Sequence, residues 1–411
     1  MNRVVITGMG VVSALGNDVE TFWSNIVNGK SGIDLITSFD TEQFNSKYAA
    51  EVKNVDYSGI SKRDLLFDSR YINFARVAAA QAYKDSKLND VQFDKDYFGV
   101  YISNSMGGVE KVSEGCDVLK DKGPSKMSPM LIPAILPNMA SGKVAIDLGA
   151  KGSNMANVSA CSGGANAIGE AYLKIKHGYE KVMVAGASDA SITPFSVACF
   201  SAMKALYRGD NKDEASIPFD KRRSGFVIGE GAAILILEEL EHAKARNAKI
   251  YAEIVGYGCN CDAYNMVSPD YEGLTCTKAM NRALEEANIK ESDISYINAH
   301  GTSTPLNDKT ETKAINEIFK SKPYVSSTKS MTGHLLSASG AIEALVTVKA
   351  LETGIMPPMI NYKEFDPECD LNFVINKSKA NPKMKYAMSN SFGFGGHNVC
   401  LIFKKWNNES N

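Results

Sequence analysis

The stretch YAEIVGYG at residues 251–258 repeats the outline of VVITGMG at residues 4–10, where an apolar run ends in Gly-X-Gly. Each run has the length and the β-branched content of a buried strand. Two such strands, far apart in one chain, indicate two similar halves. Residues 238–247 form a charged helical segment before the second strand, with no Pro/Ser/Gly-rich tract, so we expect the halves to pack as one body. The predicted domains are residues 1–249 and 250–411.

Apolar residues recur at helical spacing in several segments, and short uninterrupted apolar runs lie between them. Alternation of helices with strands that are buried on both faces is typical of an α/β fold, and we predict largely parallel sheets. The predicted helices cover residues 165–172, 280–287 and 341–348, and the predicted buried strands cover residues 182–187, 232–237 and 294–299.

The composition excludes several classes of protein. In 411 residues, 44% hydrophobic content and 22% charged content describe a globular chain rather than a disordered one. Lys and Arg number 45 against 47 Asp and Glu, which argues against a nucleic-acid binder. No apolar run is long enough to insert into a membrane, and the first residues lack the apolar core of a signal peptide. We therefore expect a cytoplasmic protein.

The first glycines of the chain do not form a dinucleotide-binding fingerprint. Gly8 and Gly10 would need a third glycine three residues later, and that position is Ser13. The sequence therefore does not predict a nicotinamide cofactor.

Four predicted strands lead into loops of small and reactive residues. Ligands of α/β proteins bind at such strand ends. The four segments are NVSACSGG at 157–164, NAHGTSTP at 298–305, SSTKSMTGH at 326–334 and SNSFGFGGHN at 389–398.

Each of these segments alone is also consistent with a structural role. Cys161 precedes a predicted helix, whose amides and dipole favour a thiolate, but an inert buried cysteine is an equal alternative. His300 and His334 are each compatible with structural or capping roles. Three of the five histidines nevertheless lie in these loops, and a cysteine with two histidines suits acyl transfer from a thioester. The spacing excludes a metal site, and the signatures of papain-like proteases are absent.

The ordered set of motifs around Cys161, NAHGTST at 298–304, STKSMTGH at 327–334 and residues 389–396 resembles the β-ketoacyl-acyl-carrier-protein synthases. It is most similar to the elongating type II enzymes of bacterial fatty acid synthesis, over essentially the whole chain. The resemblance implies a thiolase-like fold, with two pseudo-repeated α/β halves in five layers, and a homodimer. It implies acyl carrier protein (ACP) as partner, malonyl-ACP and acyl-ACP as substrates, and no required cofactor.

The resemblance also implies a role for each site residue. Cys161 would take the acyl group, and His300 and His334 would hold the malonyl thioester carbonyl. The backbone amides of Cys161 and Phe394 would form an oxyanion hole, and Lys329 would supply a positive charge. The remaining matches are the arm contacts Thr302 and Thr304, the gate Phe394 with its neighbour Phe392, and the acyl-pocket residue Met106.

Two further sets of residues match family features. Basic residues that would meet the acidic carrier protein are Lys62, Arg63, Arg70 and Lys204, although Leu66 and Phe67 stand where the family often has an Arg-Lys pair. A structural monovalent-cation site would comprise Asn298, Glu343, Ser389 and Asn390. Solvated surface charges and a buried Glu343 satisfied by helix amides are the respective alternatives.

The Cys-His-His set favours an elongating enzyme over its relatives. Degradative thiolases resemble Cys-His-Cys, and Cys400 lies on the predicted final strand rather than in the glycine loop. Initiating enzymes resemble Cys-His-Asn, whereas His334 takes the third place here. Ser162, Gly163 and His397 depart from the pattern of the bacterial elongating enzymes and adjoin the pocket. A polyketide or specialised-lipid ketosynthase and a non-catalytic chain-length subunit remain alternatives, although Cys161 argues against the second.

Overall fold

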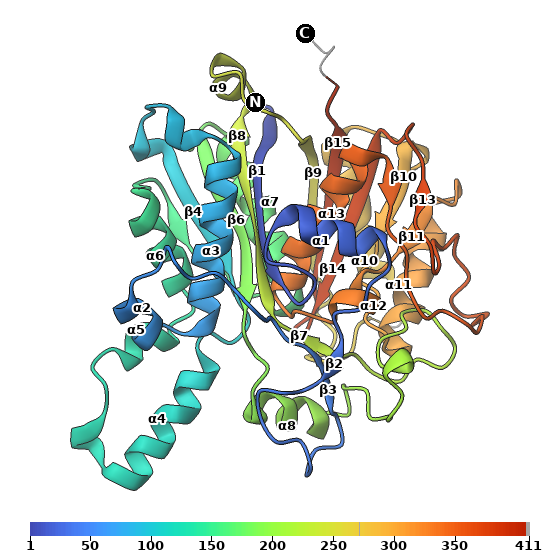
Figure 1. Cartoon of the computed structure of the whole chain (residues 1–411). Coiled ribbons are helices and arrows are strands. Elements are labelled where there is room, and N and C mark those ends of the chain that lie inside the picture. The colour runs from blue at the N-terminus through green and yellow to red at the C-terminus, as the bar shows by residue number, and fades with distance from the viewer. Residues whose placement is uncertain (271, 408–411) are drawn as a thin grey trace.

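The computed structural model describes residues 1–270 and 272–407, and one large sheet dominates it (Figure 1). Its 10 strands run in the order β11-β10-β14-β15-β9-β1-β8-β6-β4-β5. Their bounds are β1 Val4–Ser13, β4 Phe98–Ser103, β5 Asn154–Met155, β6 Val182–Asp189, β8 Gly231–Glu239, β9 Ala252–Cys261, β10 Ile294–Asn298, β11 Tyr324–Ser326, β14 Tyr386–Gly393 and β15 His397–Lys405.

The helices alternate with these strands along the chain, as the apolar spacing predicts. The principal helices are α1 Val19–Val27, α2 Lys62–Phe67, α3 Arg70–Asp85, α4 Val109–Lys122, α5 Leu131–Ile135, α6 Met139–Leu148, α7 Gly163–Lys176, α8 Pro194–Ala202, α9 Leu240–Ala245, α10 Leu274–Ala287, α11 Pro305–Ile318, α12 Lys329–Thr332 and α13 Ala338–Thr353. Smaller sheets are formed by β2 Asp34–Leu35, β3 Tyr48–Ala50 and β7 Ile228–Gly229, and by β12 Ile355–Met356 and β13 Lys379–Ala380.

The two strands with Gly-X-Gly endings meet at the centre of the sheet. Val4–Ile6 of β1 pairs antiparallel with 252–254 of β9. From this centre the order β1-β8-β6-β4-β5 on one side matches β9-β15-β14-β10-β11 on the other, with the same strand directions at each step. The fold therefore consists of two pseudo-repeated α/β halves, as predicted.

The prediction of largely parallel sheets was wrong. Every neighbouring pair from β14 to β6 across the centre is antiparallel, and only the outer pairs are parallel. Helices cover both faces of the sheet, so antiparallel strands are buried here as fully as parallel ones. A continuous apolar run indicates that a strand is buried on both faces, but it does not indicate whether the neighbouring strands are parallel or antiparallel to it.

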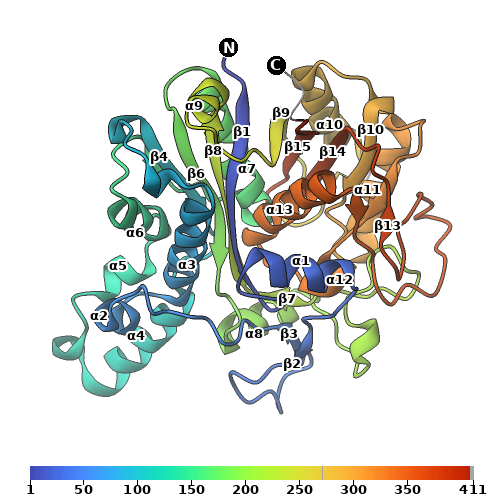
Figure 2. The same ribbon diagram turned by 45° about the horizontal axis from the view of Figure 1, so that its top comes forward.

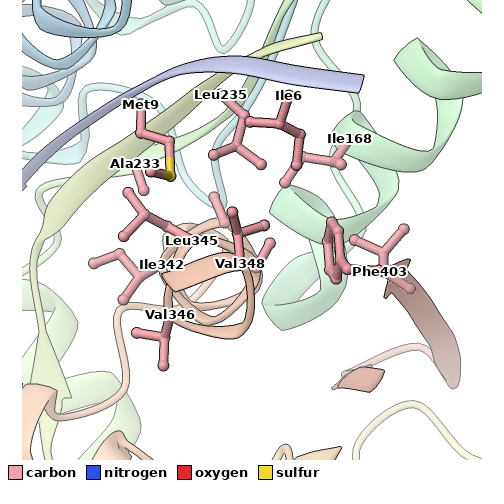
Figure 3. Close-up of a cluster of buried hydrophobic side chains, with 14 of the residues drawn as sticks. Ile6, Met9, Ile168, Ala233, Leu235, Ile342, Leu345, Val346, Val348 and Phe403 are labelled. Atoms are coloured by element: carbon pink, nitrogen blue, oxygen red, sulfur yellow. The ribbon is translucent and has the colours of Figure 1, made fainter. Parts of the chain in front are cut away.

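The helices form three layers around the two half-sheets. α3 and α6 cover the outer face of the first half, α10 and α11 cover that of the second, and α7 and α13 lie between the halves (Figures 1 and 2). Figure 3 shows the packing around α13: Ile342 and Leu345 face side chains of β1 and β8, and Phe403 of β15 lies nearby. α13 is buried from Ala338 to Leu351 because both halves enclose it.

Glycines explain how closely the outer helices approach the central strands. A Cβ on Gly10 would overlap the carbonyl oxygen of Ala78 in α3, and one on Gly258 would overlap that of Ala279 in α10. The two Gly-X-Gly motifs therefore serve the same packing purpose in both halves. Of the helices in the described ranges, none combines the length and the apolar character that a membrane crossing needs.

We expect Gly10→Ala to destabilise the protein by about 1–3 kcal/mol, because the new methyl group must displace α3 from β1. Gly142 in α6 is a matched control, since nothing lies within 4 Å of the position of its Cβ. Gly142→Ala should stabilise the protein by about 1 kcal/mol through helix propensity. Urea unfolding of both variants measures these changes, and an unchanged midpoint for Gly10→Ala would contradict the close-packing argument.

Candidate active site

Cys161 lies at the point where the chain turns into α7. It occupies a 3-10 turn, Ala160–Ser162, directly before the first residue of that helix. Ala160 adopts the left-handed conformation with φ of 47°, a strained arrangement that recurs at functional sites. A side chain on Gly163 would collide with the hydroxyl groups of Ser103 and Ser337, which explains the glycine that follows this turn.

Two opposing influences act on the thiol of Cys161. Burial raises its pKa to about 12, while Lys329 and the backbone amides of Phe394 and Cys161 oppose that shift. The amides of Phe394 and Cys161 therefore lie near Sγ, where they favour its ionised form. The sequence placed Cys161 correctly at a helix N-terminus, but it did not reveal how fully the surrounding loops would bury the side chain.

The two histidines lie close together in neighbouring loops. Their ring centroids are 5.4 Å apart at an interplanar angle of 85°, and Phe392 packs edge-on to His300 at 5.7 Å. The backbone of His334 is held by a 2.7 Å hydrogen bond to the carbonyl of Val227. Burial lowers the pKa of both imidazoles well below the usual range, and Lys329 lowers both further, so both rings are neutral at pH 7.

Lys329 is almost completely buried, and its ammonium contacts His300. Its ammonium donates to the carboxylate of Glu343, to the carbonyl of His300 at 2.6 Å, and to Nδ1 of His300 at 3.4 Å. An ammonium has no lone pair, so Nδ1 accepts and the proton of His300 is on Nε2. Burial raises the pKa of Glu343 to about 7, and Lys329 opposes that shift.

One cavity of about 420 Å³ brings most of the predicted site residues together. It also includes apolar residues that sequence reasoning missed, among them Phe200, Phe226 and Leu336. The predicted residues that line it are Met106, Cys161, Lys204, His300, Thr302, Thr304, His334, Phe392, Phe394 and the backbone of Gly393. Cys400 is buried in β15 opposite Asn390 and is not among the lining residues.

The other predicted carrier-docking residues do not line this cavity. Lys62 and Arg63 are exposed on α2, and Arg70 at the start of α3 forms an ion pair with Glu230 at 2.5 Å. His397, one of the departures from the family pattern, begins β15 and its ring lies close to Gly395 of the glycine loop.

Carboxylates on α11 hold the loop that carries His300, and sequence reasoning missed them. Glu311 accepts hydrogen bonds from the amides of His300 at 2.9 Å and Gly301 at 2.8 Å, and Asp308 accepts from the amide of Thr302 at 2.9 Å. The available signal was their spacing: acidic residues three apart share one face of a helix that directly follows the loop.

Asp189 at the end of β6 was also missed. Its carboxylate accepts hydrogen bonds from the amide and hydroxyl of Ser105, and from the amide of Ala338 at 3.3 Å. Burial raises its pKa to about 7. It thereby joins the loop before Met106 to the start of α13.

The four residues of the predicted cation site share one unusual property. Each has a buried side-chain oxygen without a hydrogen-bond partner: Asn298, Glu343, Ser389 and Asn390. Carboxylate, amide and hydroxyl oxygens are the ligands that hard monovalent cations take, so this donor set suits such an ion. Helix amides do not satisfy Glu343, whose one partnered oxygen accepts from Lys329.

We expect the double variant Lys329→Met/Glu343→Gln to raise the pKa of His334. Burial is the larger cause of the depressed pKa and remains, but the nearby positive charge is gone. The protonation midpoint of His334, measured by nuclear magnetic resonance (NMR), should move to higher pH. Lys349→Met is the control, since this lysine of α13 pairs with Glu352 and is absent from the causes that shift the pKa of His334. An unchanged midpoint in the double variant would contradict the assignment.

Fold and site together define a class of enzyme. A thiolase-like α/β body places a cysteine at a helix N-terminus and two neutral histidines around one cavity, an arrangement that suits an acyl-transferring condensing enzyme.

The chain belongs to the β-ketoacyl synthase family. The model of the beta-ketoacyl synthase N-terminal domain matches residues 1–243, and that of the C-terminal domain matches residues 251–363. Enzymes of this family need no added cofactor.

Individual relatives cover the whole chain. It is 47% identical over 98% of both chains to 3-oxoacyl-[acyl-carrier-protein] synthase 2 of Synechocystis sp., and equally to that of Staphylococcus aureus strain COL. Among solved structures, a β-ketoacyl synthase from Burkholderia phymatum superimposes with a TM-score of 0.91 at 34% identity, covering 99% of this chain and 100% of that one. A ketosynthase solved with its type II polyketide acyl-carrier protein gives the same TM-score, identity and coverage.

Proposed function

We propose that this protein condenses malonyl-ACP with an enzyme-bound acyl chain, with loss of carbon dioxide, to give 3-oxoacyl-ACP in fatty acid elongation. The observation that carries the proposal is the single cavity that holds Cys161, His300 and His334. Relatives at 47% identity over 98% of the chain carry the name of that activity.

In the first step, Sγ of Cys161 attacks the thioester carbonyl of acyl-ACP. The thiol proton passes to the departing phosphopantetheine sulfur, so the step is neutral overall. The negative oxygen of the tetrahedral intermediate accepts hydrogen bonds from the amides of Cys161 and Phe394, which lie near Sγ. Preorganised amides of this kind are a principal source of catalysis in acyl transfer.

In the second step, malonyl-ACP occupies the site above the acylated cysteine. Its thioester oxygen accepts hydrogen bonds from Nε2 of His300 and His334, and the carbon–carbon bond of the carboxylate breaks to give an enolate and carbon dioxide. The enolate carbon attacks the acyl carbonyl, which releases the sulfur of Cys161. That sulfur takes one proton from water and returns to the neutral thiol.

Neutral imidazoles are suited to this step. The depressed pKa of each ring keeps one N–H available as a donor without a fixed positive charge that would bind the malonyl carboxylate and prevent its loss. Lys329 is too deeply buried to meet the substrate, and in this scheme it orients His300 and favours anions at Cys161.

The remaining residues of the cavity receive the acyl chain and the phosphopantetheine arm. The hydroxyl groups of Thr302 and Thr304 lie 2.8 Å apart at the cavity wall and contact the arm. Phe394, beside Phe392 and between flexible glycines, is the gate. Met106 packs with the apolar cluster that contains Phe226 and Leu336, where the acyl chain lies.

Basic residues meet the acidic carrier protein. Lys204, at the edge of the cavity, is the member of the predicted set that adjoins the catalytic residues, and Lys62 and Arg63 are exposed on α2. Arg70 is the weakest member, because Glu230 already partly neutralises it. A monovalent cation held by the oxygens of Asn298, Glu343, Ser389 and Asn390 would stabilise the two loops that carry His300 and Phe394.

The assembly is a cytoplasmic homodimer whose subunits each comprise halves 1–249 and 250–411. Support for the dimer comes from the edge strand β5, whose two residues are exposed. Exposed apolar side chains gather on the segments around it in the chain, and they are Ile132, Leu136, Ile146, Met155 and Val158. The mass in solution by light scattering tests this assignment, and a monomeric mass would reject it.

Two other functions are alternatives to fatty acid elongation, and experiment distinguishes them. A polyketide ketosynthase has the same chemistry with another acyl chain, and a solved ketosynthase of that kind is 34% identical. Another similar structure, 32% identical, is a ketosynthase/chain length factor complex, but a non-catalytic subunit of that type would not need Cys161.

The experiment is intact-protein mass spectrometry after mixing with acyl-ACPs of graded chain length, followed by malonyl-ACP. We expect a mass gain on Cys161 and a 3-oxoacyl-ACP product. Saturated acyl chains of increasing length indicate fatty acid elongation, whereas acceptance of poly-β-keto chains indicates a polyketide ketosynthase. The absence of acylation by any chain would reject the proposed function.

A further inference from the structure

A buried serine contacts Nδ1 of His334. Ser339 is the second residue of α13 and is 2% exposed. Its Oγ lies 2.9 Å from Nδ1 of His334 and 2.8 Å from the backbone nitrogen of Leu335. Neither of these contacts follows from the motifs that identify the cysteine and the histidines.

The two contacts assign the protons on this part of the site. The amide of Leu335 is a donor, so Oγ of Ser339 accepts from it. Oγ has a second lone pair, but Nδ1 is the one contact of this hydroxyl in the described chain that can accept its proton, so donation to Nδ1 is the arrangement that uses every hydrogen-bonding group. A neutral imidazole that accepts at Nδ1 has its proton on Nε2.

His300 reaches the same tautomer in a different way. Its Nδ1 faces the ammonium of Lys329, which can only donate. Within residues 1–270 and 272–407, Nδ1 of His334 contacts a hydroxyl group rather than the ammonium of Lys329, and a hydroxyl in general donates or accepts equally well. The tautomer of His334 is therefore the less firmly held of the two, and the bond from Leu335 to Ser339 is what gives the hydroxyl its direction.

We propose that Ser339 is a positioning residue that holds His334 in the Nε2–H tautomer. The proposal rests on the proposed function, in which Nε2 of His334 donates to the malonyl thioester oxygen. With the proton on Nδ1, the lone pair of Nε2 would face the oxygen that becomes negative, and one of the two donors would be replaced by a repulsion.

The neighbouring turn offers a matched control. Ser337 is also fully buried and precedes α13 by one residue, but its hydroxyl lies 2.8 Å from that of Ser103 and contacts no histidine. Ser337→Ala and Ser339→Ala remove the same atom from positions two residues apart at the start of one helix. A general disturbance of α13 should affect both variants alike.

The first measurement is the ¹⁵N spectrum of protein labelled in histidine, with His334 assigned by the loss of its signals in His334→Ala. We expect a pure Nε2–H tautomer of His334 in the wild type and in the control variant Ser337→Ala. In Ser339→Ala we expect a mixture of the two tautomers. A proton on Nδ1 in the wild type would overturn the proposal without any variant. An unchanged Nε2–H tautomer in Ser339→Ala would overturn it as well.

The second measurement is the rate of malonyl-ACP decarboxylation. In Ser339→Ala this rate should fall about tenfold, as is usual when a partner that orients a reacting imidazole is removed, while acylation of Cys161 stays unchanged. The proposal would be overturned if Ser337→Ala lost as much decarboxylation activity as Ser339→Ala. It would also be overturned if Ser339→Ala lost as much acylation as decarboxylation, because either result would indicate a general structural effect. Failure of the wild type to condense substrates would reject the proposed function instead, and the tautomer spectra would still decide the role of Ser339.

Discussion

Cys161→Ala should lower the rate of 3-oxoacyl-ACP formation by a factor on the order of 10⁴ or more, because the variant cannot form the acyl-enzyme. The thiol lines the cavity at the start of α7, whereas the neighbouring Ser162 does not, and the amides of Cys161 and Phe394 lie near the sulfur. Alanine retains the backbone amides and occupies less space, so the fold should survive. Intact-protein mass spectrometry should detect no acyl adduct with any acyl-ACP.

Malonyl-ACP decarboxylation by Cys161→Ala distinguishes loss of the nucleophile from disruption of the whole active site. His300 and His334 do not depend on the sulfur for their positions, since Lys329, Glu311 and Ser339 hold them. The variant should therefore still release carbon dioxide from malonyl-ACP. Cys199→Ala, which removes an exposed thiol from α8, should form the adduct normally. Elongation by Cys161→Ala would reject the mechanism.

His334→Ala should lower malonyl-ACP decarboxylation by about 10²–10³-fold, the usual loss when one donor to a developing oxyanion is removed. Acylation of Cys161 should continue, because its oxyanion hole consists of backbone amides. The measurement pairs release of labelled carbon dioxide with the mass of the acyl-enzyme.

His177→Ala is the control for that variant, because this histidine is exposed at the end of α7. Both activities should remain normal in it. Loss of acylation with decarboxylation intact in His334→Ala would reverse the assigned roles. Loss of both would mean that His334 holds the site together rather than acting on malonyl-ACP.

The sequence was informative where a local pattern has a local physical cause. Gly10 and Gly258 indicated two similar halves because a strand that meets a helix backbone so closely cannot carry a side chain. The helices around residues 165–172, 280–287 and 341–348 followed from apolar spacing, and all three were confirmed within α7, α10 and α13.

Strand direction and the layer order could not be read in the same way. The apolar run at 232–237 lies in β8 between two antiparallel neighbours, and its composition would be the same between parallel ones. The family resemblance, not the periodicity, supplied the five layers. The structure then explained why α13 is buried along most of its length: both halves pack on it (Figure 3).

For the active site too, local sequence patterns were informative and long-range contacts were not predicted. The motifs identified Cys161, His300 and His334, but Glu311 and Asp189 were missed, because a carboxylate that accepts backbone amides from a distant loop leaves little local signal. The amides that were expected to favour the thiolate of Cys161 do lower its pKa, but burial by loops that are far apart in the chain raises it more.

The amino-acid sequence by itself determined the class of fold, the reactive residues and their order, because glycine packing, helix periodicity and long catalytic motifs are properties of neighbouring residues. The tertiary structure alone decided which strands are antiparallel, which carboxylates hold the His300 loop, and which nitrogen of each histidine carries the proton. These features depend on contacts between segments separated by many residues, such as Lys329 with His300 and Ser105 with Asp189.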